Sequence, residues 1–251
     1  NNALVNRLRA GLQAPLRLTL NMAHDLNEVA GQAARYLQAD SSQFSNYLQS
    51  EQVLSDFGLE PFDLKGIFLA NTYEFYWNTS PQDFVARMLK ESNRFWESRY
   101  AKLEETGLSQ AEVITLASIV ESETAKPDEM PRVAGLYLNR LAKGIKLQSD
   151  PTVIYAHQLA NRDTVIRRVW NKYLSIDSPY NTYKYKGLPP GPIRIPDPRS
   201  IDAVLNAESH EFIFMCADPD RPGYHAFART NRQHNVNRLK YQRWANQNGI
   251  Y

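Results

Sequence analysis

Residues 109–124 read Ser109-Gln-Ala-Glu-Val-Ile-Thr-Leu-Ala-Ser-Ile-Val-Glu-Ser-Glu-Thr124. A serine followed three residues later by a glutamate forms a capping box, which predicts a helix from Ser109 to Thr124. At about 100° per residue, Glu121 falls inside the apolar arc of this helix, whereas Glu112 and Glu123 lie at its edges. The arc itself consists of Val113, Ile114, Leu116, Ala117 and Val120. The sequence therefore predicts that one carboxylate, Glu121, points into the protein interior.

An inward carboxylate has two interpretations. Burial removes water from the charged form and raises the pKa, so that the group can hold a proton near neutral pH and act as a general acid. Alternatively, Glu121 is a structural residue that forms an ion pair with Arg132 or Arg140 on the following helix. Helix geometry alone favours the structural role, because single inward carboxylates are often ion-paired.

The flanking sequence predicts a fold of the α+β class. We place a small α/β subdomain at residues 1–75 and a mixed α+β catalytic domain, with Glu121 on a helix, at residues 76–251. Further helices are expected at 25–38, 42–49, 50–57, 131–143 and 232–246, with one long helix from Ser80-Pro81 to about Glu105. Strands are expected at 15–20, within 66–77, and at 211–217, where the strand should be buried. Residues 187–196 are rich in Pro and Gly and predict a stiff loop.

Composition excludes several classes of protein. The chain has 29 Lys and Arg against 27 Asp and Glu, so it lacks the concentrated positive charge that binds nucleic acid. Its one cysteine, Cys216, cannot form an internal disulfide, and no apolar run reaches the roughly 20 residues that cross a bilayer. The sequence nevertheless begins within an apolar helical pattern, and we expect that an N-terminal piece has been removed. That pattern consists of Ala3, Leu4, Leu8 and Leu12.

Several ordered blocks resemble the YceG-like family of endolytic murein transglycosylases. They are Leu116-Ala-Ser-Ile-Val-Glu-Ser-Glu-Thr124, Val133-Ala-Gly-Leu-Tyr-Leu-Asn-Arg-Leu141, Leu147-Gln-Ser-Asp-Pro-Thr-Val-Ile-Tyr155, Ser178-Pro-Tyr-Asn-Thr-Tyr183, Gly187-Leu-Pro-Pro-Gly-Pro-Ile193 and His225-Ala-Phe-Ala-Arg-Thr-Asn-Arg-Gln-His-Asn235. Upstream, Asn71-Thr-Tyr-Glu-Phe75 extends the resemblance, which covers about residues 60–245. Agreement over many blocks is far more specific than one short motif. The chain departs from the pattern at Ala70-Asn71 and at Ser149, where a threonine is commoner.

The resemblance implies that Glu121 is the catalytic acid and base. The implied reaction cleaves the β-1,4 bond between N-acetylmuramic acid and N-acetylglucosamine without water. Glu121 would protonate the leaving oxygen and then take the proton of the muramic acid C6 hydroxyl, which attacks the anomeric carbon and leaves a 1,6-anhydro end. Intramolecular attack explains why one carboxylate suffices where hydrolytic glycosidases use two. Glu123 ranks second, as an orienting or structural partner.

Other candidate site residues come from the same blocks. Gln148, Asp150 and Thr152 follow the helix that ends at Gly144, in a loop that can face a sugar, although Asp150-Pro151 equally suits a turn or a helix N-cap. Asn181 and Tyr183 offer amide and aromatic contacts to sugars, or else they only shape a loop. Asn139 and Arg140 are candidates to brace Glu121. His225 and His234 lack a zinc-site pattern, and no metal or organic cofactor is implied.

The resemblance also implies a cellular setting. Family members carry a membrane anchor followed by a LysM-like module, so residues 1–75 are expected to contain part of that module. The protein would be a single-pass protein of the bacterial cytoplasmic membrane, with its catalytic domain on the periplasmic side. Its partners would be peptidoglycan strands and cell-wall synthesis proteins.

Three other functions remain open. The chain could be a noncatalytic glycan-binding or scaffold protein of cell-wall synthesis, or a lysozyme-like hydrolase. An older label for this family, aminodeoxychorismate lyase, would require pyridoxal phosphate. The sequence has neither a Gly-rich phosphate loop nor a distinguished lysine for that cofactor.

Overall fold

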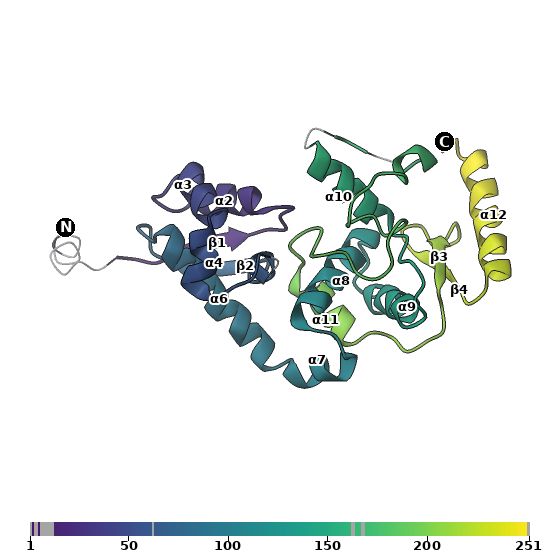
Figure 1. Ribbon diagram of the computed structural model, residues 1–251, viewed down its shortest axis with the longest axis horizontal. Helices are drawn as coiled ribbons and strands as arrows, with labels where there is room; N and C mark the ends of the chain where they lie inside the picture. The colour runs from purple at the N-terminus through teal and green to yellow at the C-terminus, as the bar shows by residue number, and fades with distance from the viewer. Residues whose placement is uncertain are drawn as a thin grey trace. The chain divides into compact units, whose positions relative to one another are not determined.

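The computed structural model describes residues 2, 5, 13–61, 63–161, 164–166 and 169–249. The predicted helical face of Ala3, Leu4, Leu8 and Leu12 lies outside these residues. The described chain is mixed α+β, with many helices and two small antiparallel sheets (Figure 1). It divides into two compact units, Asn1–Ser98 and Arg99–Tyr251. A search of the described residues finds no helix with the length and apolar character needed to cross a bilayer.

The first unit is built around an antiparallel pair of strands. Strand β1 (Leu16–Leu20) pairs with β2 (Asn71–Phe75). Between them in the chain lie the helices α2 (Leu26–Ala34), α3 (Ser41–Leu48), α4 (Glu51–Phe57) and α5 (Asp63–Gly66). Two of the predicted helix ends are confirmed, because the Asp25 side chain caps α2 and Gly58 ends α4 with a φ of 63°. The sequence therefore predicts these local boundaries well, although α2 ends earlier than residue 38.

The first unit extends further along the chain than the boundary expected at residue 75. Helix α6 (Pro81–Glu97) begins at the predicted cap Ser80. The ring of Phe84 on α6 lies 5.4 Å from that of Phe44 and 5.3 Å from that of Phe75, so α6 packs on the core of this unit. The helix expected to run on to Glu105 is interrupted, and α7 (Tyr100–Thr106) is separate. Packing of α6 thus moves the division between units to Ser98.

Helix α8 (Gln110–Glu123) lies at the centre of the second unit. Its predicted capping box between Ser109 and Glu112 is present. It packs against α9 (Met130–Ala142), α10 (Asp150–Ala160) and α11 (Pro198–Leu205). Several of its apolar side chains have no exposed surface, namely Val113, Leu116, Ala117, Ile119 and Val120. The apolar arc predicted from the sequence is therefore the core-facing side of α8.

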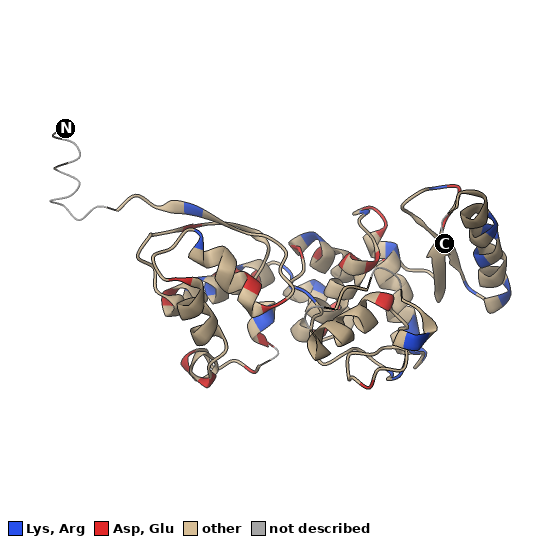
Figure 2. Ribbon diagram, turned by 90° about the horizontal axis from the view of Figure 1, so that it is seen from above, with Lys and Arg blue, Asp and Glu red and all other residues tan. Residues whose placement is uncertain are grey.

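The C-terminal part of the second unit is a small sheet covered by a helix. Strand β3 (Phe214–Ala217) pairs with β4 (His225–Ala228), and α12 (Asn231–Gln247) packs on both. The strand expected at 211–217 is shorter and only half-buried, because α12 covers one side and a pocket lies on the other. The short 3-10 helix Asn171–Tyr173 and the loop 187–196 complete the unit. Helix α12 carries Lys and Arg but no acidic residue (Figure 2).

Candidate active site

A pocket of about 220 Å³ opens in the second unit beside the C-terminal end of α8. It is smaller than the roughly 300–1,000 Å³ typical of drug-sized ligand sites. Its polar lining consists of Glu123, Tyr137, Arg140, Gln148, Asp150, Tyr183 and His225. Its apolar lining consists of Leu136, Leu147, Met215, Cys216 and Ala217. Five of the residues predicted for the site are therefore brought together here, and Glu121 does not line the pocket.

Glu123, the last residue of α8, is held by two hydroxyl groups. Its Oε1 accepts a hydrogen bond of 2.7 Å from Tyr137 on α9 and one of 2.5 Å from Ser149, which precedes α10. Burial raises the pKa of Glu123, and the hydroxyls of Ser149 and Tyr137 offset part of that rise. Both donors lie on Oε1, so Oε2 has no protein donor among the residues that the structure describes. Glu123 thus combines raised proton affinity with an oxygen available to a ligand.

Another part of the pocket lining comes from the two blocks that contain residues 148 and 183. The Tyr183 hydroxyl donates a hydrogen bond of 2.6 Å to Asp150, and both side chains line the pocket. Gln148 also lines it, and its φ of +50° is unusual for a residue other than glycine. Backbone strain of this kind persists where the surroundings enforce it and is common at binding sites. Asp150 belongs to helix α10, which corrects the prediction of a loop here.

Two of the predicted substrate residues instead stabilise the structure. Thr152 has no exposed surface and bonds to the Ser149 carbonyl and the Thr182 hydroxyl. Asn181 is equally buried, and its side-chain nitrogen donates to the carbonyls of Leu174 and Ile176. Neither lines the pocket. Because their polar groups are satisfied by buried protein atoms, they shape the loop rather than meet a sugar.

The expected bracing of Glu121 by Asn139 and Arg140 is not observed among the described contacts. Asn139 donates to the carbonyls of His210 and Phe212, 2.7 Å and 3.1 Å away. Arg140 donates to the carbonyl of Ile213 at 2.6 Å, and it also bonds to the loop before α10. Burial lowers the pKa of the Arg140 guanidinium, which forms part of the pocket lining. These residues of α9 therefore hold the chain that leads into β3.

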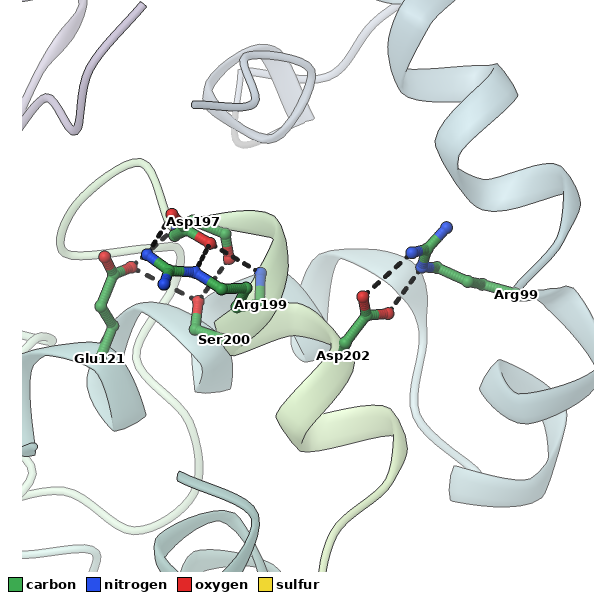
Figure 3. Close-up of polar contacts among 6 residues, drawn as sticks. All are labelled: Arg99, Glu121, Asp197, Arg199, Ser200 and Asp202. Atoms are coloured by element: carbon green, nitrogen blue, oxygen red, sulfur yellow. Dashed lines mark hydrogen bonds and ion pairs between the residues drawn. The ribbon is translucent and has the colours of Figure 1, made fainter. Parts of the chain in front are cut away.

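Glu121 lies on α8, and its carboxyl group points to the N-terminal end of α11, as Figure 3 shows. Its Oε2 accepts a hydrogen bond of 2.9 Å from the Asp197 backbone and a longer one of 3.4 Å from Ser200. Burial raises its pKa, and the Asp197 N–H lowers it in part. Arg199 folds back to pair with the Asp197 carboxylate at 2.9 Å. The ion pairs of Glu121 with Arg132 or Arg140, considered from the sequence, are not among the described contacts, since Arg132 pairs with Glu208.

Four residues in or next to the pocket were not predicted from the sequence as part of the site. Tyr137 and Ser149 bond to Glu123, and a hydroxyl at position 149 would also be supplied by the commoner threonine. His225, at the start of β4, lines the pocket and bonds through Nδ1 to Glu129 at 2.9 Å. The sequence blocks that resemble the family contain Tyr137, Ser149 and His225. Their place in these blocks is the sequence feature that could have indicated a role in the site. Glu129 lies between two blocks and carried no such signal.

Comparisons with known proteins give a consistent result. Residues 1–240 match the model of the YceG-like family. The chain is 35% identical over 179 residues to the endolytic murein transglycosylase of Bacillus subtilis, which covers 71% of this chain and 48% of that protein. It is 29% identical over 157 residues to the protein of the same name from Streptococcus pneumoniae, covering 62% and 28%.

The fold also matches a solved structure. The crystal structure of a yceG-like protein from Listeria monocytogenes superimposes with a TM-score of 0.73 at 25% identity, covering 94% of this chain and 80% of that one. The chain spans about half or less of the length of these two curated relatives.

Proposed function

Because the chain belongs to the YceG-like family, we propose that it is an endolytic murein transglycosylase and that Glu123, rather than Glu121, is its acid and base. The observation that carries the choice of residue is the pocket, which Glu123 lines together with Gln148, Asp150 and Tyr183. Glu123 was the second candidate from the sequence.

The proposed reaction begins with the protonated form of Glu123. Oε2 donates the proton to the glycosidic oxygen, the bond between this oxygen and the anomeric carbon breaks, and positive charge develops on the muramic acid ring. The C6 hydroxyl of the same sugar then attacks the anomeric carbon, and the Glu123 carboxylate takes the hydroxyl proton. The products are a 1,6-anhydro end and a free C4 hydroxyl, and Glu123 regains its proton.

The surroundings support Glu123 over Glu121. Both carboxyl groups receive their protein hydrogen bonds on one oxygen, Oε1 of Glu123 and Oε2 of Glu121. Glu123 lines a pocket with a Tyr, an Asp and a Gln in its wall, whereas Glu121 faces the beginning of a helix. The Asp197 N–H at this helix end donates to Glu121 and offsets part of the rise in its pKa, which suits a carboxylate that holds α11 in place.

The decisive experiment compares two isosteric variants. Purified glycan strands are digested in oxygen-18 water with the native chain, with Glu123→Gln and with Glu121→Gln, and the new ends are identified by mass spectrometry. We expect unlabelled anhydro ends from the native chain, their loss in Glu123→Gln, and their retention in Glu121→Gln. Each substitution keeps the shape of the side chain, so we expect both variants to fold. Circular dichroism and thermal unfolding test that expectation.

Other outcomes lead to different functions. Labelled reducing ends would identify a hydrolase, since the oxygen would then come from water. Saturable glycan binding without cleavage by any of the proteins would favour a noncatalytic or scaffold role. Loss of anhydro ends in Glu121→Gln with full activity of Glu123→Gln would return the catalytic role to Glu121.

The proposed substrate also bears on location. Peptidoglycan lies outside the cytoplasmic membrane, so this activity supports a periplasmic or other extracytoplasmic site of action. A single-pass anchor ahead of these residues, LysM-like character within residues 1–75, and contacts with cell-wall synthesis proteins stay predictions from the family resemblance.

A further inference from the structure

We infer that His225, oriented by Glu129, is a second residue of this pocket that contacts the glycan, through a hydrogen bond between its Nε2 and a sugar hydroxyl beside Glu123. The inference rests on the proposed function, because it assigns a role within the same site. It is carried by the geometry of the Glu129–His225 pair and by the position of His225 in the pocket lining.

The Glu129 carboxylate holds His225 at two points. Oε1 accepts the His225 backbone N–H at 2.7 Å, and Oε2 lies 2.9 Å from Nδ1 of the ring. The Glu129 side chain is only 4% exposed and that of His225 is 18% exposed, so water competes little for these bonds. The pair therefore fixes the position of the imidazole against the backbone of β4.

The same contact determines which ring nitrogen is available. Burial alone would raise the pKa of Glu129, but the hydrogen bonds from His225 and Thr124, together with the charge of His225, outweigh burial and lower the pKa, so Glu129 is a carboxylate at neutral pH. A carboxylate can only accept hydrogen bonds, so Nδ1 of His225 must carry the proton. Nε2 is then the ring nitrogen left for a ligand, and no described residue bonds to it.

The surroundings of His225 suit a sugar hydroxyl. Glu123 and Glu129 lie at the two ends of the short connection between α8 and α9, so His225 and the proposed acid meet at the same end of α8. Both line one pocket, and His225 lies close enough to influence the Glu123 carboxyl electrostatically. A hydroxyl can donate to a neutral Nε2 or accept from a protonated one, so this contact does not require one charge state of the ring.

Two substitutions separate the two nitrogens of the ring. His225→Asn places an amide near the position of Nδ1 and can keep the bond to Glu129, but it lacks any atom at the position of Nε2. His225→Gln places an amide near the position of Nε2. His157→Asn is the matched control, since His157 is a partly buried histidine of the same unit that bonds to the Tyr173 carbonyl outside the pocket.

We expect His225→Asn to lower kcat/KM for release of anhydro ends by about tenfold or more, the loss expected for one hydrogen bond to the reacting sugar. His225→Gln should lose less, and His157→Asn should cleave like the native chain. Thermal unfolding of His225→Asn should match the native protein. A merely structural histidine predicts the opposite order, with His225→Asn active because its bond to Glu129 is kept, and that result would overturn the inference.

Binding provides a test that does not depend on turnover. Affinity for purified uncrosslinked glycan strands is measured in the Glu123→Gln protein with and without His225→Asn. If the native chain fails to cleave, the proposed activity fails, but weaker strand binding by the double variant still supports the contact at His225. Equal affinity of the two proteins, together with absent cleavage by the native chain, would refute it.

Discussion

Two hydroxyl groups donate hydrogen bonds to the Glu123 carboxylate, and the shorter bond, of 2.5 Å to Oε1, comes from Ser149. Replacing Ser149 by alanine removes that bond. Burial raises the pKa of Glu123, and the hydroxyls of Ser149 and Tyr137 lower it because they stabilise the charged form. A hydrogen bond to a charged group contributes about 1.5–3 kcal/mol. We therefore expect Ser149→Ala to disfavour the charged form of Glu123 by roughly that amount, which raises its pKa further.

The direction of the resulting change in activity follows from the mechanism. Glu123 must be protonated to begin the reaction, so kcat/KM falls as pH rises through the pKa of Glu123 in the free enzyme. A higher pKa keeps the acid protonated to higher pH. Ser149→Ala should therefore shift the falling, alkaline limb of the profile to higher pH. The assay is the initial rate of anhydro-end formation from purified glycan strands across the acidic, neutral and mildly alkaline range.

Ser200 provides a matched control for this experiment. It is as buried as Ser149, with 0% and 1% of their surfaces exposed, but its hydroxyl lies 3.4 Å from Oε2 of Glu121. If Glu123 is the acid, Ser200→Ala should leave the alkaline limb where it is. A shift caused by Ser200→Ala, with none caused by Ser149→Ala, would refute the assignment and indicate Glu121.

Further predictions concern stability. Arg99 donates to the two carboxylate oxygens of Asp202 at 2.7 Å and 3.0 Å (Figure 3), and because the pair is partly exposed, Asp202→Asn should lower the free energy of unfolding by no more than about 1 kcal/mol in urea titrations. Gly135→Ala would place a Cβ atom 2.3 Å from the backbone oxygen of Glu208, so we expect a loss of about 1–3 kcal/mol and a lower Tm. Gly31 lies inside α2 with nothing within 4 Å of such an atom, and Gly31→Ala should instead stabilise the protein by about 0.5–1 kcal/mol, measured in the same titration. A destabilised Gly31→Ala or an unaffected Gly135→Ala would contradict the packing around these positions.

The helix ends could be predicted from sequence because the interactions that fix them are local. The caps at Asp25, Ser80 and Ser109 each involve backbone groups within three residues, and Gly58 adopts its positive φ without help from distant parts of the chain. The unit boundary depends on contacts of another kind. Helix α6 joins the first unit in part through packing of Phe84 against Phe44, which is distant in sequence, and no local pattern encodes that choice.

The site shows the same limit in a sharper form. A helical wheel gives the direction of a side chain relative to its own helix, but it does not say what the side chain meets there. Glu121 and Glu123 are two positions apart, so they point about 200° away from each other, and burial raises the pKa of both. Raised proton affinity alone therefore cannot distinguish them.

What distinguishes the two carboxylates is the partner that each meets after folding. Glu121 meets the N-terminal end of α11, where a backbone N–H occupies one of its oxygens. Glu123 meets hydroxyls from α9 and from the segment before α10. It also lines a pocket together with His225, which is about a hundred positions later in the sequence. A general acid needs both proton affinity and an oxygen that the substrate can reach. Of the two carboxylates, Glu123 is the one that lines the pocket, and we therefore expect the chemistry at the carboxylate that the wheel placed at the edge of the apolar arc.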